Sequence, residues 1–405
     1  MQDNEKKPAL RFKGFTDPWE QRKVGTLIED YTEKTVTQNQ YPVLTSSQQQ
    51  GIVLQEDYFA DRQVTTDNNV GYYVLPKGYF TYRSRSDTDV FVFNRNNIVD
   101  KGIISYYYPV FAPKSCDSNF LLRRLNHGIK KQLSMAAEGT GQKVLAHAKF
   151  KNMVVDVPSQ SEQEKIGTIL EELDTLITLH QRKYEKLVNI KKSMLDKMFP
   201  KNGASVPEIR FKGFTDPWEQ RKLTNLCEKF TDGDWIEAKD QSDSGVRLVQ
   251  TGNVGVTEYL DKPNNKKWIS FETFEQLHCE EVYPGDILIS RLPEPAGRAC
   301  IMPNLGTKMI TAVDCTIVRP NAVTSTRFLL QYLSSQAYFD AVNTCLAGGT
   351  RQRISRGNLA QFNVPIPSSK IEQEKIGEVL EKLDTLITLH QREHIKPILE
   401  VKRVK

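Results

Sequence analysis

Two glycine-containing segments carry the side chains best suited to contact a phosphate group. One is Gly139 to Lys143 (GTGQK), and the other is Gly348 to Arg353 (GGTRQR). Gly349, Thr350 and Gln352 of the second match Gly139, Thr140 and Gln142 of the first at an offset of 210. Glycine lets a backbone approach a phosphate, threonine and glutamine donate hydrogen bonds, and a lysine or arginine adds positive charge. An ordinary loop before a strand is the alternative, but the duplication favours phosphate contact. The predicted phosphate-binding residues are Gly139, Thr140, Gln142, Lys143, Gly349, Thr350, Arg351, Gln352 and Arg353.

Four arginines on loops that follow expected strands are candidates for reading bases. Arg83 and Arg85 come after an aromatic run, and Arg291 and Arg298 bracket a proline-rich loop. A guanidinium group can donate two hydrogen bonds to the two acceptors of guanine in the major groove. Taken alone, each arginine is more often solvated or bound to a phosphate, so the sequence does not decide among the four.

The distribution of charge along the chain says more about a partner than the total charge does. There are 55 basic and 50 acidic residues, which gives a net charge of only +5. Between Ser118 and Val155, however, the only acidic residue is Glu138, and from Ala341 to Ile371 there is none. One such tract is usually a solvated face. Two tracts at matching places in a duplicated chain favour a polyanionic partner such as a nucleic acid.

The sequence lacks the motifs of the common catalytic classes. It has no Walker loop, no H-E-x-x-H, no G-x-S-x-G and no cluster of nuclease carboxylates. The repeated TDPW at 16–19 and 215–218 has one proline, whereas the base-gripping motif of amino-methyltransferases has two. We expect this element to form a turn that begins a short helix. The sequence therefore predicts a recognition protein with no catalytic residue, no metal site and no cofactor of its own.

Cysteine usage and hydropathy predict a cytoplasmic protein. One of the six cysteines lies in the first half and five lie in the second, and no two form a C-x-x-C pair. This pattern suits a reducing compartment and argues against a disulfide framework or a zinc site. The sequence shows no signal peptide and no apolar run near the roughly 20 residues that span a bilayer, so no membrane contact is expected.

Two long helices are expected to position the candidate residues, because one stretch with a helical period occurs twice. Residues 162–182 and 372–392 are identical at 18 of 21 positions, at an offset of 210. Apolar residues recur every seven positions, which is typical of a coiled-coil seam, and a histidine on such a seam usually fixes register. Each copy begins with a Ser-x-x-Glu capping box. The predicted seam residues, from two antiparallel helices related by a pseudo-twofold axis, are Ile166, Leu173, His180, Ile376, Leu383 and His390.

A second repeated block divides the chain into two halves. RFKGFTDPWEQRK occupies residues 11–23 and recurs unchanged at 210–222, at an offset of 199, so the segment between the constant blocks is 11 residues longer in the second half. Both inserts alternate β-branched and aromatic runs with turn residues, and helices are expected at 120–137 and 328–342. We predict a mixed, α+β fold with two domains of irregular, mostly antiparallel sheets plus helices, joined by the two long antiparallel coiled-coil helices.

The same signals predict the boundaries of these parts. The first domain covers 1–158, the first long helix 159–200, a flexible linker 201–208, the second domain 209–367 and the second long helix 368–405. Pro200 should end the first helix. Pro397, which lies seven residues after His390, should break or kink the second helix.

These blocks together resemble the specificity (S) subunit of type I restriction-modification systems, over nearly the whole chain. The resemblance rests on FKGFTDPWEQRK, on EQEKIGxxLExLDTLITLHQR, on the insert ending GGTRQRIS and on the order variable, helix, variable, helix. It implies two target recognition domains that read the halves of a split, asymmetric sequence in double-stranded DNA, with the helices as a ruler. It also implies two methyltransferase (M) subunits and further restriction (R) subunits as partners, with S-adenosylmethionine, ATP and Mg bound by those partners. The C-terminal HIKPILEVKRVK departs from the KSMLDKMF that continues the first helix.

Two other classes of function remain as alternatives. A coiled-coil adaptor could join two proteins without binding DNA, but the acid-depleted tracts in both inserts would then have no role. A methyltransferase or nuclease in one chain would need a cofactor loop or a carboxylate cluster, and the sequence shows neither.

Overall fold

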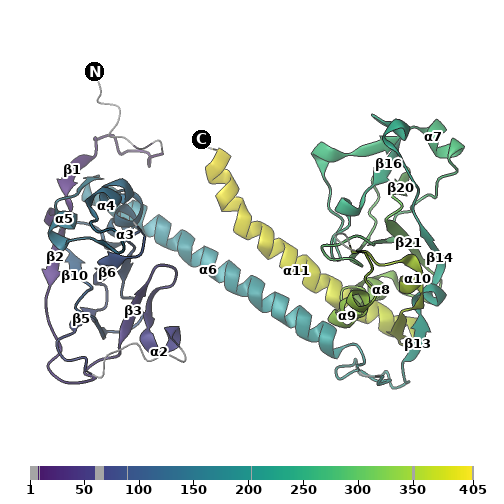
Figure 1. Cartoon of the computed structure of the whole chain (residues 1–405), viewed down its shortest axis with the longest axis horizontal. Helices are drawn as coiled ribbons and strands as arrows, with labels where there is room; N and C mark the ends of the chain where they lie inside the picture. The colour runs from purple at the N-terminus through teal and green to yellow at the C-terminus, as the bar shows by residue number, and fades with distance from the viewer. Residues whose placement is uncertain are drawn as a thin grey trace. The chain divides into compact units, whose positions relative to one another are not determined.

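The computed structural model describes residues 8, 10–59, 68–88, 90–201, 203–348 and 352–403, with side chains up to residue 391. The chain forms two compact units, Met1–Ile177 and Thr178–Lys405. The long helix α6 (Gln160–Lys197) begins in the first unit and ends in the second, as the teal ribbon in Figure 1 shows.

The first unit is built on a four-stranded antiparallel sheet with the strand order β2-β10-β6-β8. Aromatic side chains form its core, in which Phe80, Tyr82, Phe93, Phe111 and Phe150 are fully buried against one another. The helix expected at 120–137 is divided into α3 and α4 around Gly128. The elements inside this unit are α1 (Val24–Leu27), β2 (Ile28–Tyr31), β3 (Leu44–Ser47), β4 (Gly51–Leu54), α2 (Gln55–Tyr58), β5 (Tyr73–Pro76), β6 (Phe80–Tyr82), β7 (Arg85–Ser86), β8 (Phe93–Arg95), β9 (Lys101–Ile104), β10 (Val110–Pro113), α3 (Ser118–His127), α4 (Lys130–Ala136), β11 (Lys143–Val144) and α5 (His147–Lys151).

The second unit repeats this sheet in the order β14-β21-β18-β19 and adds a second sheet, β15-β17-β16-β20. Only the pairing of β16 with β20 is parallel among the strand ladders of the described residues, which confirms the mixed, mostly antiparallel prediction. The elements are η2 (Leu223–Leu226), β14 (Cys227–Asp232), η3 (Ala238–Asp240), β15 (Gln241–Ser242), β16 (Val246–Val249), η4 (Thr251–Asn253), η5 (Pro263–Asn265), β17 (Lys267–Ile269), α7 (Phe271–Gln276), β18 (Ile287–Ser290), β19 (Ala299–Ile301), β20 (Met309–Thr311), β21 (Cys315–Pro320), α8 (Thr326–Tyr332), α9 (Gln336–Thr344) and α10 (Arg356–Gln361).

The two constant blocks of each half meet in space and form a frame that encloses the variable insert. In the first unit β1 (Glu20–Lys23) pairs with β12 (Val154–Val157), and in the second β13 (Glu219–Lys222) pairs with β22 (Asn363–Ile366) in the same register. The TDPW element therefore leads into a strand, and the prediction that it begins a helix is wrong. The backbone after TDPW is extended and not helical, because the EQRK that follows it pairs with a partner strand.

A buried arginine–glutamate pair closes each of these frames. The guanidinium of Arg11 donates to both carboxylate oxygens of Glu162 at 2.7 Å, and Arg210 donates to Glu372 at 2.8 and 2.9 Å. Both glutamate side chains are buried. The predicted capping boxes are thus incomplete, because each glutamate carboxylate accepts from an arginine of the other constant block instead of from its own helix end.

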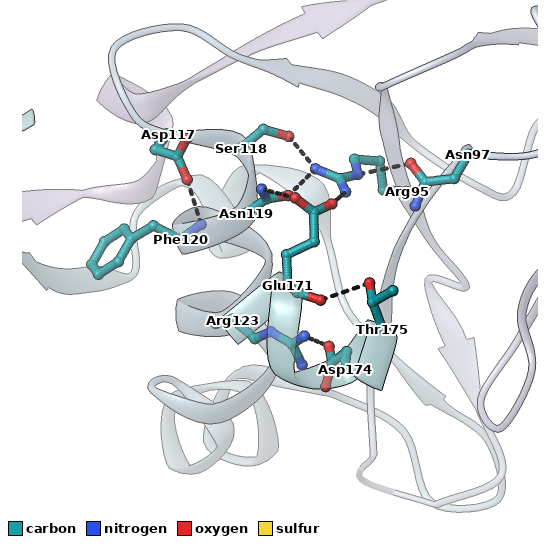
Figure 2. Close-up of polar contacts among 10 residues, drawn as sticks. All are labelled: Arg95, Asn97, Asp117, Ser118, Asn119, Phe120, Arg123, Glu171, Asp174 and Thr175. Carbon is teal, nitrogen blue, oxygen red and sulfur yellow. Dashed lines mark hydrogen bonds and ion pairs between the residues drawn. The ribbon is translucent and has the colours of Figure 1, made fainter. Parts of the chain in front are cut away.

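The first turns of the repeated helices also hold the start of the helix that packs on them. Gln163 accepts a hydrogen bond from the backbone N–H of Asp117 at 3.0 Å, and Gln373 accepts from that of Ser325 at 2.8 Å. A Cβ at Gly167 would overlap the side chain of Asp117, so a glycine is required for this close approach. Figure 2 shows the next turn, where Glu171 accepts from Arg95 at 3.3 Å and from Asn119 at 2.7 Å. The pair Arg123 and Asp174 lies one turn further on.

In the second unit the end of α6 runs antiparallel to α11 (Lys370–Arg403). The rings of His180 and His390 lie 5.7 Å apart, and Lys191 pairs with Asp384, so residue numbers rise on one helix as they fall on the other. Ile376 is buried in the core of this unit, and Leu383 packs against the same cluster, which includes Met198 from the segment after α6. The predicted contact of the two repeated helices is therefore present at these positions.

The structure bears on three further predictions about the helices. Ile166 packs against the core of the first unit instead of against a second helix, because the first turns of α6 lie on that domain. Leu173 is 41% exposed, and its assignment to a seam stays a prediction. The helix α11 continues through Pro397 to Arg403, so a break at this proline is wrong, and the alternative of a kink stays a prediction.

Removing the carboxylate of Glu372 should destabilise the second unit strongly. Glu372→Ala would leave the Arg210 guanidinium without its carboxylate in a mostly buried site, at a cost of about 3 kcal/mol. Denaturant unfolding of the full chain would measure the loss. Glu374→Ala is the matched control, because Glu374 is exposed on the same helical turn. Equal stability of the two variants would contradict this account of the frame.

Candidate nucleic-acid interface

The GTGQK segment of the first unit forms a tight loop that is held at both ends. Glu138 and Val144 exchange two backbone hydrogen bonds, of 3.0 and 2.7 Å, across its base. Gly139 has φ +116, and a Cβ there would overlap the carbonyl oxygen of Gln142. The loop therefore needs a glycine at its first position for conformational reasons. Thr140 and Gln142 are exposed on it, and no acidic side chain of the described residues pairs with Lys143.

The structure brings this loop beside the first pair of base-reading candidates. Strand β11 pairs with β7, so Lys143 lies opposite Ser86 and Val144 lies opposite Arg85. The amide of Gln142 donates to Asp87 at 3.2 Å. Arg83 and Arg85 are exposed and line a shallow hollow together with Gln48, Ser86 and Asn94, among other residues. Residues that the sequence predicted separately as phosphate contacts and as base readers therefore share one edge of the first unit.

Two tyrosines that sequence reasoning missed belong to the same edge. Tyr106 and Tyr107 lie in the turn between β9 and β10, and they are 55% and 41% exposed. The Arg85 guanidinium lies 4.3 Å from the centre of the Tyr107 ring, a cation–π contact that holds the arginine in one orientation. The run Tyr106-Tyr107-Tyr108 at a turn between strands was the signal that could have identified them.

A chain of polar contacts that begins at the buried Tyr82 and ends at the exposed Asp30 supports this part of the first unit. The Tyr82 hydroxyl lies 3.2 Å from Nδ1 of His147, and Nε2 of His147 lies 2.9 Å from Asp30. Lys151 donates to the other oxygen of Asp30 at 2.7 Å. Burial opposes the ionisation of Asp30, but the hydrogen bonds from Lys151 and His147 outweigh it and keep the pKa of Asp30 below its usual value. The charged form of Asp30 thus ties β2 to α5, immediately after the loop.

The equivalent loop of the second unit is shifted by one residue from the sequence alignment. Ala347 and Arg353 exchange the two backbone hydrogen bonds that Glu138 and Val144 exchange in the first unit, and Gly348 has φ +117. Gly348 therefore corresponds to Gly139, at an offset of 209, and the predicted match of Gly349 to Gly139 is wrong. The cause is one additional residue between β22 and α11. The predicted contacts Gly349, Thr350 and Arg351 lie outside the described residues, while Gln352 and Arg353 are exposed.

Arg291 does not lie free on the surface as a base reader would. It is 9% exposed, donates to the carbonyl of Val313 at 2.6 Å and lies 3.4 Å from the carboxylate of Asp232 and 3.9 Å from that of Asp314. Arg353 is the more accessible arginine, at 3.8 Å from the same Asp314. In the second unit, carboxylates thus compensate the arginines at the position where the first unit presents uncompensated ones.

Arg298 holds a loop together. Its guanidinium donates to five backbone carbonyls, those of Thr251, Leu292, Pro293, Val254 and Pro295, at 2.6 to 3.0 Å. Three of these carbonyls share the two N–H groups of Nη1, so at most four of the five N–H groups of the guanidinium are engaged. The prediction that Arg298 reads a base is not supported, because the loop that it follows folds back onto it.

The acid-depleted tracts are not uniformly basic surfaces in three dimensions. Glu138, the one acid inside the first tract, pairs with Lys149. Acids outside the tracts pair with four other bases, namely Arg123 with Asp174, Arg124 with Asp156, Lys151 with Asp30, and Arg356 with Asp232. A tract that contains few acids in sequence can still face them in space. Arg83, Arg85 and Lys143 have no acidic partner among the described residues, so the positive charge at this edge of the first unit is uncompensated.

Neither a metal cluster nor a membrane span is found in the part of the chain that the structure describes. No group of three or more histidine, cysteine or acidic side chains there could hold an ion. No helix there is both long and apolar enough to cross a bilayer. All six cysteines are free thiols.

The fold and this edge define a chain of two similar α/β domains, each with exposed basic loops, joined to two long helices. The chain belongs to the family described as type I restriction modification DNA specificity domain, whose model matches residues 17–189 and again 215–399. The family match thus covers both halves of the repeat.

Relatives and one solved structure agree with the family match. The chain is 23% identical over 276 residues to the type I restriction enzyme MjaVIII specificity subunit of Methanocaldococcus jannaschii, which is 64% of this chain and 62% of the relative. It is 24% identical over 291 residues to the putative MjaX specificity subunit of the same organism, covering 68% and 63%. The chain therefore aligns with less than two thirds of the length of these curated relatives. The S subunit of a type I restriction-modification system from M. genitalium has the same fold, with a TM-score of 0.55 at 12% identity over 98% of this chain and 97% of that one.

Neutralising Asp314 should strengthen the binding of DNA irrespective of its sequence. Asp314→Asn keeps the shape of the side chain but removes the negative charge that faces Arg291 and Arg353. The slope of log affinity against log salt should steepen by up to about one, because one more cation is available to a phosphate. Titration of a random-sequence duplex at several salt concentrations would measure this. Asp243→Asn, in an exposed loop of the same unit, is the control, and an unchanged slope for Asp314→Asn would refute the compensation.

Proposed function

We propose that the chain is the sequence-specific DNA-binding subunit of a type I restriction-modification complex and catalyses no reaction itself. The observation that carries the proposal is the exposed edge of the first unit, where Arg83, Arg85 and the Gly139–Lys143 loop converge. An arginine on such an edge can read guanine, while glycine, threonine and lysine contact phosphates. A coiled-coil adaptor would give these uncompensated charges no role.

The duplicated frame supports recognition of a target in two parts. The first domain (1–158) and the second (209–367) share a sheet order but differ in the residues at their edges, so each would read a different half of an asymmetric, split sequence. The linking helix α6 has 38 residues and is about 57 Å long. We propose that this length sets the spacer between the two half-sites.

The partners follow from the family and not from contacts within this chain. We propose that two methyltransferase (M) subunits and additional restriction (R) subunits assemble on the chain in the cytoplasm. S-adenosylmethionine, ATP and Mg would be bound by those subunits. The MjaVIII and MjaX relatives are named specificity subunits of restriction enzymes, which supports this assignment.

Two substitutions at the first edge should have different effects on DNA binding. Lys143→Ala should weaken binding to all duplexes and reduce the salt slope by about one, because one phosphate contact is lost. Arg85→Ala should instead relax the preference at one base pair, at a cost of about 1–3 kcal/mol on the preferred sequence. Binding of the assembled complex to a library of single-base variants would separate the two. Lys77→Ala, in the turn at the other end of strand β6, should change neither property, and identical behaviour of all three variants would remove the edge from the interface.

Methylation mapping in cells that carry the chain with its M subunit tests the function as a whole. The expected result is adenine methylation on both strands of one split, asymmetric motif. Deleting the heptad 181–187 should shorten α6 by about 10.5 Å and the tolerated spacer by about three base pairs. No new methylated motif from an assembled complex would favour the adaptor, and an unchanged spacer would reject the role of α6 as a ruler.

A further inference from the structure

One turn is equivalent in the two units although its residues differ completely. In the first unit the hydroxyl of Ser84 donates to the carbonyl of Tyr107 at 2.7 Å, and in the second the N–H of Arg291 donates to the carbonyl of Asp314 at 2.8 Å. Leu145 donates to the Ser84 carbonyl as Ile354 does to that of Arg291. The Tyr106-Tyr107 turn before β10 therefore corresponds to the Val313-Asp314 turn before β21.

In the first unit this turn presents aromatic rings to solvent beside positive charge. The centres of the Tyr106 and Tyr107 rings are 4.2 Å apart, and their hydroxyls are hydrogen-bonded at 3.1 Å. Arg85 covers the Tyr107 ring, and Lys143 lies on the strand that pairs with β7. Exposed aromatic rings that are held rigidly and flanked by cations are typical of surfaces on which nucleic-acid bases stack.

The second unit has no aromatic residue in this turn, but a neighbouring segment supplies one. Trp235 follows β14 and is 72% exposed. The residues before it are fixed to the turn, since Gly233 donates to the carbonyl of Cys315 and Asp234 to that of Thr311, both at 2.9 Å. The carboxylate of Asp234 also accepts from the backbone of Glu280 at 2.9 Å.

The surroundings of Trp235 give the indole a firm base without covering it. A Cβ at Gly233 would overlap the carbonyl of Thr311, so the backbone is pressed against the end of β20. The indole N–H makes one long hydrogen bond, of 3.4 Å, to Glu237. Asp232, three residues before Trp235, pairs with Arg356 of α10 at 3.7 Å, which ties the end of β14 to that helix. A large apolar ring exposed on a rigid support is a feature of binding hot spots.

We propose that Trp235 stacks on a base of the second half-site and that Tyr106, the more exposed ring of its pair, does so in the first. Each unit thus places an aromatic ring at the same end of its sheet, but from a different element. The proposal rests on the proposed DNA-binding function and adds its mode, which is local unstacking of the duplex by an inserted side chain. The two half-sites would then differ in the aromatic residue that contacts them as well as in their hydrogen-bonding groups.

The test uses the full chain assembled with its M subunit and a duplex carrying the sequence that the wild-type complex methylates. Trp235→Ala and Tyr106→Ala should each weaken binding about tenfold, whereas Tyr106→Phe, which keeps the ring, should bind as the wild type does. Phe271→Ala is the matched control, because Phe271 is also an exposed aromatic residue, 55% exposed, but lies on α7.

A fluorescent base separates stacking from a merely structural effect. With 2-aminopurine placed in turn at each purine other than the methylated adenine, the wild-type complex should brighten one position in each half-site. Trp235→Ala should abolish only the signal in the second half-site, and Tyr106→Ala only that in the first. Unchanged affinity and signal in both variants, with the wild type bound, would overturn the proposal. Failure of the wild-type complex to bind any duplex would instead overturn the DNA-binding function.

Discussion

The buried pair of an arginine and a glutamate, present once in each half, is the constraint on which the rest of the structure depends. Arg11 and Arg210 belong to the first constant block of their half, and Glu162 and Glu372 belong to the second. Each pair, with the β1–β12 or β13–β22 ladder beside it, fastens the two ends of the insert together. An insert between fixed ends can change its length and residues without moving the helix that follows. The divergent sheets of this chain are therefore compatible with helical blocks that are nearly identical.

The sequence predicted the elements that repeat better than the positions of the residues that do not. The seven-residue period and the duplication were sufficient for the long helices and the two halves. The alternation of β-branched and aromatic runs with turn residues was sufficient for the mostly antiparallel sheets. The sequence did not predict that Gly348, and not Gly349, corresponds to Gly139, because the residues around Gly349 match those around Gly139 at an offset of 210. Only the backbone pairing of Ala347 with Arg353 reveals the offset of 209. The register of backbone hydrogen bonds, unlike the identity of residues, cannot be seen in a single amino-acid sequence.

The arginines of the two edges show why candidate contacts could not be ranked from sequence. Arg85 and Arg298 both follow strands and both looked like base readers, yet Arg85 lies exposed over a tyrosine ring and Arg298 is bonded to five carbonyls. The difference arises from which loop folds back over the side chain. The acidic partners of the basic tracts could not be predicted either, because most of them come from other parts of the sequence. Asp314 and Asp232 are distant from Arg353 and Arg356 in sequence and meet them only in the folded unit.

On the proposed DNA-binding function, the carboxylates Asp232 and Asp314 beside the arginines of the second unit affect selectivity as well as affinity. An arginine that leaves Asp314 for a phosphate or a base exchanges one anion for another, so the net number of counterions released is smaller than at the first edge. When the DNA offers a mismatched base, the same arginine can return to its carboxylate and avoid remaining unpaired. The protein then dissociates quickly from a mismatched sequence, because the arginine regains a carboxylate partner when it leaves the DNA. The compensated half of the chain would thus act mainly through the rate of dissociation, and the uncompensated half through the rate of encounter.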